Sequence, residues 1–218
     1  MLLSFTAHEY AHARVALHEG DQTAYMLGRV TWNPIRHIDP FLTVLLPLVM
    51  WFGSGGQMVY GGAKPVPTNP RNYRNFRRGD ILVSLAGVTM NLFVAIGCAL
   101  AIPVLGVIGR AIPAIEPSAG IVQTMAVIGL RLNLILVVFN VLPFPPLDGS
   151  HVVKHFLPAR LSLWYQRFGG YAFLALILSM WLDPRPIRAL LYPALGTSQW
   201  VTTALSGSLL PSTGRGVK

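Results

Sequence analysis

The chain has 218 residues, of which 53% are hydrophobic and 11% charged, with a net charge of +9 and a mean hydropathy of +0.52. This balance excludes an ordinary soluble domain and indicates an integral membrane protein, whose first partner is the lipid bilayer. The basic residues lie in short loops between apolar runs, so the positive charge does not indicate a nucleic-acid-binding protein. The single cysteine, Cys98, excludes an intramolecular disulfide and a thiolate metal cluster.

The first informative element is the pattern HExxH, formed by His8, Glu9 and His12. Residues four apart share one face of a helix, so both imidazoles can bind one Zn²⁺ while Glu9 lies beside the metal and activates a water. The alternative is a surface helix that carries these three residues by chance. Flanking apolar residues such as Leu3 and Phe5 favour the metal site, because polar groups in an apolar setting need a partner.

The segments around this helix and after it are shorter or more polar. The apolar sequence before His8 is too short to cross half of a bilayer core of about 30 Å, so we expect a truncated first helix. Residues 28–40 are turn-rich, and Val30 to Trp32 is predicted to form a short strand. Residues 41–52 are apolar and contain Pro47, which favours a kinked span or a re-entrant segment.

Longer apolar runs follow. Residues 81–108, 121–142 and 171–182 are predicted spans, and residues 187–205 are a weaker candidate. We therefore expect an all-α polytopic membrane protein with about five to six transmembrane or re-entrant segments and a short β/loop membrane-associated segment. Residues 1–205 would form the functional domain, and residues 206–218, rich in Ser, Gly and Pro, a flexible tail.

Loop charge predicts the orientation of these segments. The connection over residues 62–80 carries five basic residues, whereas residues 110–120 carry one, Arg110, opposed by Glu116. The positive-inside rule therefore places the first loop in the cytoplasm. The end of the 121–142 helix then lies near the cytoplasmic face of the cell membrane.

A zinc site needs a third ligand, and four residues are candidates. His18 has the spacing of the third metzincin histidine, but Val15 replaces the helix-breaking glycine of that motif. Asp21 and Asp39 lie in turn-rich sequence and are predicted to be cap or turn residues. Asp148 ends an apolar run through a proline-rich turn, and a carboxylate at such depth is a functional candidate.

Three ordered motifs resemble the site-2 protease family of intramembrane zinc metalloproteases, peptidase family M50. They are HExxH, then Gly87-Val88-Thr89-Met90-Asn91, then Asn140-Val141-Leu142-Pro143-Phe144-Pro145-Pro146-Leu147-Asp148-Gly149. The resemblance covers about residues 2 to 182 and is much more specific than HExxH alone. Val88 departs from the pattern, because many members carry proline there. We expect a compact form without a PDZ or CBS domain.

The resemblance implies the roles of six residues. One zinc ion per chain would be held by His8, His12 and Asp148, with Glu9 as general base. Asn91 and Asn140 would donate hydrogen bonds to the substrate backbone or the oxyanion. Two alternatives stay open. Asn91 could be a polar contact in a small-residue helix interface, and Asn140 could serve a cap or turn.

The function implied is a zinc endopeptidase that hydrolyses peptide bonds within or near transmembrane segments of membrane proteins. Such a substrate must unwind locally, because a transmembrane helix hides its carbonyls in internal hydrogen bonds. The alternative is a non-enzymatic zinc transporter or metal sensor that uses the same ligands. His151 and His155 are predicted to be structural, and residues 64–67 are a candidate edge for pairing with substrate. The sequence leaves the oligomeric state open.

Overall fold

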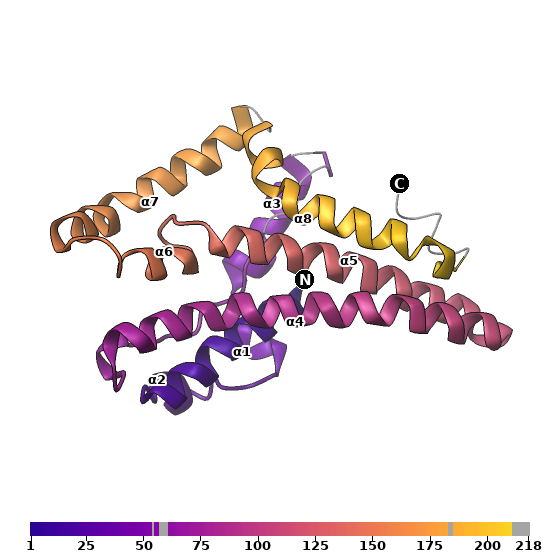
Figure 1. Cartoon of the computed structure of the whole chain (residues 1–218), viewed down its shortest axis with the longest axis horizontal. Helices are drawn as coiled ribbons and strands as arrows, with labels where there is room; N and C mark the ends of the chain where they lie inside the picture. The colour runs from indigo at the N-terminus through magenta and orange to yellow at the C-terminus, as the bar shows by residue number, and fades with distance from the viewer. Residues whose placement is uncertain (54, 57–60, 183–184, 211–218) are drawn as a thin grey trace. The chain divides into compact units, whose positions relative to one another are not determined.

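A computed structural model describes residues 1–53, 55–56, 61–182 and 185–210 of the chain. The described residues are mostly helical and contain no β-strand (Figure 1). They group into two compact units, Met1–Met90 with His151–Ser162, and Asn91–Ser150 with Leu163–Lys218. The helices α4 (Phe76–Ala111) and α6 (Asp148–Val153) each continue across a boundary between the two units.

The first unit is built around the N-terminal helix α1. Its elements are α1 (Leu2–Glu19), α2 (Thr23–Met26), η1 (Pro34–His37), the π-helix η2 (Pro40–Leu45), α3 (Leu46–Gly53), η3 (Pro70–Asn72), the first turns of α4, the end of α6 and the start of α7 (Ala159–Leu182). Small residues on one face of α1 let other elements approach closely. Ala13 packs with Ala24 and Val66, and Ala16 packs with Tyr73 and Val83.

The predicted strand at Val30 to Trp32 is wrong, because these residues form bends. The carbonyl of Thr31 accepts a hydrogen bond from Nε2 of His37, which is fully buried, and the Trp32 ring packs on Tyr10. A strand forms only when its backbone groups hydrogen-bond to a neighbouring strand. Here the His37 side chain bonds the Thr31 carbonyl that such a neighbour would have used. Residues 40–53 form a continuous apolar helical stretch, shorter than the roughly 20 residues that cross a bilayer.

Asp21 ties the end of α1 to the loop that precedes α4. Its fully buried carboxylate accepts hydrogen bonds from the backbone and hydroxyl of Thr23, from the backbone of Asn69 (2.7 Å) and from the side chain of Asn72 (2.9 Å). Burial alone would raise the pKa of this carboxyl, but these hydrogen bonds outweigh it and hold the pKa below its usual value. The predicted turn role of Asp21 is confirmed, and so is that of Asp39, which caps η2.

We expect Asp21→Asn to lower the stability of the protein by about 1.5–3 kcal/mol at neutral pH, because the amide places a donor against a donor. A carboxyl with a lowered folded pKa stabilises above its unfolded pKa of about 3.9, and this contribution disappears as the pH falls through the folded value. Thermal denaturation of both proteins in detergent checks this. The difference between them should shrink below about pH 4, and a constant difference would contradict the assignment.

The second unit consists of long apolar helices. It holds the rest of α4, then η4 (Pro113–Ile115), α5 (Glu116–Val141), most of α7 (Ala159–Leu182), α8 (Arg185–Ala204) and η5 (Ser206–Ser208). Helices α5 and α8 lie side by side in Figure 1 and make extensive contact. The core of the unit is formed by Ala95, Ile102, Ala126, Val127 and Leu130.

Two helical stretches in the described residues, Phe76–Ala111 and Pro113–Val141, are long and apolar enough to cross a membrane. Only 22% and 28% of their most apolar windows are buried within the protein. The core helix of a soluble protein would be mostly buried, whereas large side chains such as Phe93, Leu100 and Met125 are exposed here. Exposed apolar surface of this extent fits contact with lipid.

The segment after α8 is held by polar contacts. The amide of Gln123 donates to the carbonyls of Ile102 and Ser208, and its oxygen accepts from the backbone of Leu210. Residues 206–210 thus pack within the second unit, while residues 211–218 of the expected tail lie outside the described residues.

Candidate metal centre

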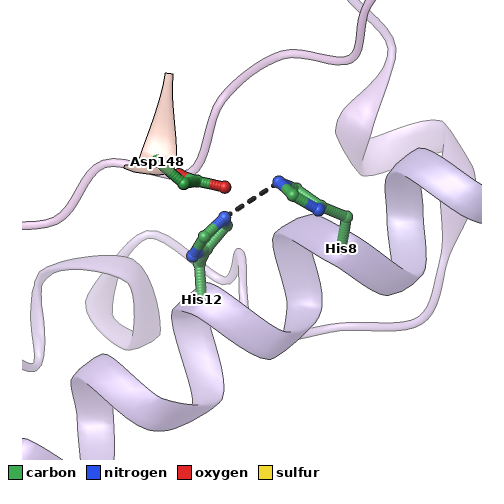
Figure 2. Close-up of side chains that lie close together, drawn as sticks. All are labelled: His8, His12 and Asp148. Atoms are coloured by element: carbon green, nitrogen blue, oxygen red, sulfur yellow. Dashed lines mark hydrogen bonds between the residues drawn. The ribbon is translucent and has the colours of Figure 1, made fainter. Parts of the chain in front are cut away.

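The HExxH residues lie on α1, an uninterrupted helix that ends at Gly20, whose φ of 111° favours glycine. His8 and His12 are buried on one face, and their Nε2 atoms are 2.9 Å apart (Figure 2). The two rings meet edge to face with centroids 4.5 Å apart. Helical spacing therefore brings two metal-binding nitrogens to one point.

The tautomer of His12 follows from its second hydrogen bond. Its Nδ1 lies 2.7 Å from the backbone carbonyl of Val83, which can only accept. Nδ1 therefore carries the proton, and in the neutral ring Nε2 keeps its lone pair for a ligand bond. A backbone carbonyl in this position is the usual support of a metal-binding histidine.

Gly87 on α4 makes room for the two imidazoles. A Cβ at this position would lie 2.5 Å from Cε1 and 2.7 Å from Nδ1 of His8, and closer still to Nε2 of His12. Real Cβ atoms do not approach so closely, so the rings could not keep their places beside any larger residue. The glycine of the GxxxN pattern is thus required by the position of both histidines.

Gly87→Ala should weaken zinc binding by about 10- to 100-fold, as the loss of support for metal ligands does elsewhere. The measurement is competition with a chromogenic chelator. Gly97→Ala is the matched control, because it lies on the same helix and a Cβ there meets nothing within 4 Å. Equal zinc affinity in both variants would show that the rings do not depend on Gly87.

Asp148 is the first residue of α6 and follows the proline-rich turn. The turn is closed by the N–H of Leu147, which donates to the carbonyl of Phe144 (2.8 Å). A Cβ on Gly149 would collide with the carbonyl oxygen of Val141, so only glycine lets α6 begin this close to the end of α5. The turn and Gly149 therefore together determine the backbone position from which the Asp148 side chain extends.

His8, His12 and Asp148 each offer a possible ligand atom, and these atoms all lie within 4.8 Å of one another (Figure 2). No other group of three His, Cys, Asp or Glu side chains in the described part of the chain meets this condition. Two nitrogens at about 2.05 Å in a tetrahedral zinc site would be about 3.3 Å apart. The observed 2.9 Å between the Nε2 atoms is close to that separation, so the donor set fits a zinc ion.

Glu9 is half-buried, and its Oε2 accepts a hydrogen bond from the backbone N–H of Val66 (2.7 Å). The N–H of Lys64 donates to the backbone carbonyl of His37, while Pro65 and Pro67 have no N–H. Residues 64–67 therefore offer no N–H donor to a substrate strand. Pairing at this edge would have to use their carbonyl acceptors, and it stays a prediction. Their remaining contact with Glu9 orients the carboxylate.

The other predicted site residues occupy separate positions. Asn91 is fully buried on α4 one turn after Gly87, and so projects from the same face of that helix. Asn140 donates its amide to the carbonyl of Leu136 four residues earlier within α5 (3.0 Å), which is an intrahelical contact and not the cap or turn role left open above. His18 is exposed at the end of α1 and is not part of the ligand group.

Two features of this region are not predicted by the sequence. The hydrogen bond between Glu9 and Val66 joins residues 57 positions apart, so no local pattern reports it. Asp80 is a buried carboxylate that contacts His151 and His155. The sequence gives one indication of this site, because Asp80 is an acidic residue directly before a long apolar run.

Comparison with known proteins gives consistent matches. The sequence model of Peptidase family M50 matches residues 1–181. The chain is 37% identical over 178 residues to YwhC of Bacillus subtilis strain 168, named as a candidate zinc metalloprotease, which covers 82% of this chain and 76% of YwhC. It is 33% identical over 149 residues to Rip2 of Mycolicibacterium smegmatis, which is named in the same way. That match covers 68% of this chain and about half, 52%, of Rip2. No solved structure matches the chain.

Proposed function

Since the chain belongs to peptidase family M50, we propose that it is an intramembrane zinc endopeptidase that cleaves other membrane proteins within or near their transmembrane segments. The observation that carries this proposal is the ligand group of His8, His12 and Asp148 with Glu9 on the same helix. Two nitrogens and one carboxylate oxygen leave a fourth position for water, as catalytic zinc sites do.

His8, His12 and Asp148 would hold one zinc ion. When bound, such an ion lowers the pKa of a water molecule and polarises a carbonyl group. Glu9 would accept the proton of the attacking water and later deliver it to the leaving amine. Asn91 and Asn140 would provide amide donors to the substrate. The amide nitrogen of Asn140 carries two hydrogens, so it can donate one to Leu136 and the other to the substrate.

The setting of this chemistry is the cell membrane. The exposed apolar surface of α4 and α5 supports a multi-pass protein whose substrate reaches the site from the bilayer. Four basic residues just before α4 and in its first turn, Arg71, Arg74, Arg77 and Arg78, support a cytoplasmic orientation of the start of that helix. Gly87 lies six residues beyond Ile81, where the apolar run begins, or about 9 Å at about 1.5 Å per residue. This is less than the roughly 15 Å to the centre of the hydrocarbon core, which supports a site on the cytoplasmic side of the membrane centre.

The test is metal analysis together with cleavage of a model transmembrane substrate by the purified full chain in detergent. We expect one zinc per chain, loss of cleavage on treatment with a chelator, and its return when zinc is added. A zinc transporter or sensor, the alternative, would bind zinc and cleave nothing. Sealed vesicles containing the protein should show zinc flux if it is a transporter and none if it is a sensor.

A further inference from the structure

Asp80, in the first turns of α4, is buried and surrounded by groups from a single segment. Its side chain is 3% exposed. Oδ2 accepts hydrogen bonds from Nζ of Lys154 and Nε2 of His155, each at 2.6 Å. Nδ1 of His151 lies 3.2 Å from Oδ1. One carboxylate thus contacts three side chains that all belong to residues 151–155.

Two neighbouring residues of α4 make further contacts with the same segment. The Phe76 ring meets His155 edge to face, with centroids 5.5 Å apart, and the guanidinium of Arg77 lies 5.4 Å from the centre of the Phe156 ring. Lys154 and His155 are themselves 12% and 9% exposed. The contacts of Lys154 and His155 are thus shielded from water and have a defined geometry, unlike mobile pairs on a surface, whereas the His151 side chain is 42% exposed.

These contacts with α4 fix the position of the C-terminal end of α6, the helix that begins with Asp148. His151 follows Asp148 by three residues, so both project from the same side of the helix. The helix has only six residues, and only Gly149 and Ser150 are buried, so apolar packing contributes little to its orientation. At its N-terminal end it is tied to the turn by Ser150, whose hydroxyl donates to the carbonyl of Leu147 (2.6 Å). The contacts with Asp80 hold its other end.

We infer that Asp80 is a positioning residue that orients α6 and thereby holds the Asp148 carboxylate in place as a zinc ligand. The inference rests on the proposed function. Asp80 is not itself in the ligand group. Without its carboxylate, Lys154 and His155 lose their shared acceptor inside the protein, and the segment must rearrange to solvate them. Because α6 is short, that rearrangement moves Asp148.

Zinc affinity of the purified full chain, measured by chelator competition, tests this inference. We expect Asp80→Ala, which removes the acceptor, to bind zinc about 10- to 100-fold more weakly, the usual effect of losing support for a ligand. Asp80→Asn loses the charge and keeps one acceptor oxygen, so its zinc affinity should fall in the same direction and by less. The cobalt-substituted variants should also show a changed visible absorption spectrum, since that spectrum reports ligand geometry. Asp80→Asn keeps the size of the side chain and serves if Asp80→Ala does not fold.

Two controls separate positioning from general stability. Asp21→Asn removes another buried carboxylate of the same unit and should lower thermal stability without changing zinc affinity or the cobalt spectrum. Gly97→Ala changes the same helix as Asp80 where a Cβ meets nothing within 4 Å, and it should bind zinc as the wild type does. If the wild type binds zinc and both Asp80 variants bind it equally well with the same spectrum, the inference is wrong. If the wild type binds no zinc, the proposed function fails and this inference with it.

Discussion

Glu9→Gln should bind zinc as the wild type does and cleave a transmembrane substrate about 10²- to 10⁴-fold more slowly, because it loses the general base and keeps every ligand. The amide oxygen of glutamine can still accept the hydrogen bond of the Val66 N–H, so the local structure should survive. Metal content and cleavage rate measured on the same preparation check both halves of this expectation.

Glu19→Gln is the matched control for this variant. Glu19 lies on the same helix, is buried, and pairs with Arg78 at 3.8 Å, away from the ligand group. It should keep its cleavage activity. A Glu9→Gln enzyme that cleaves at nearly the wild-type rate would rule out Glu9 as the base. A transporter would retain most of its zinc flux in this variant, so the same protein distinguishes the two functions.

Asp148→Asn should lower zinc affinity by more than about 100-fold and abolish cleavage, because a neutral amide oxygen is a poor substitute for a carboxylate ligand. The change preserves size and shape, so helix α6 should still form. Chelator competition and the cleavage assay measure the two losses. The magnitude should exceed that of the Asp80 variants, which act on the ligand indirectly.

His18→Ala is the control here, because His18 is the other candidate third ligand by spacing and lies exposed at the end of α1. It should change neither zinc binding nor cleavage. An experimental structure with His18 bound to the metal, and the Asp148 carboxylate well beyond the roughly 2.0–2.2 Å of a zinc–oxygen bond, would overturn the assignment.

Much of the helical architecture could be predicted from the sequence. Apolar runs at residues 81–108 and 121–142 correspond to α4 (Phe76–Ala111) and α5 (Glu116–Val141). The placement of His8, Glu9 and His12 on one helix was predictable for the same reason. Helix formation depends on residues three and four apart and on local breakers such as Gly20, so its determinants lie within a few positions of each other.

The predicted strand at Val30 to Trp32 was wrong, because strand formation, unlike helix formation, depends on distant parts of the chain. A strand is defined by its pairing with another segment, and the short Val-Thr-Trp run contains no information about a partner. The structure uses the carbonyl of Thr31 for His37 and the Trp32 ring for Tyr10 instead. Composition predicted what the run prefers locally, but long-range contacts decided its conformation.

The sequence by itself determined which residues can bind metal and transfer protons, because those properties belong to the side chains and their helical spacing. The tertiary structure decided how they are supported. Glu9 meets Val66, His12 meets Val83 and Asp80 meets His155 across 57, 71 and 75 positions of the chain. Such contacts form only when separate elements pack together, and their distances depend on small residues such as Gly87 that permit the approach.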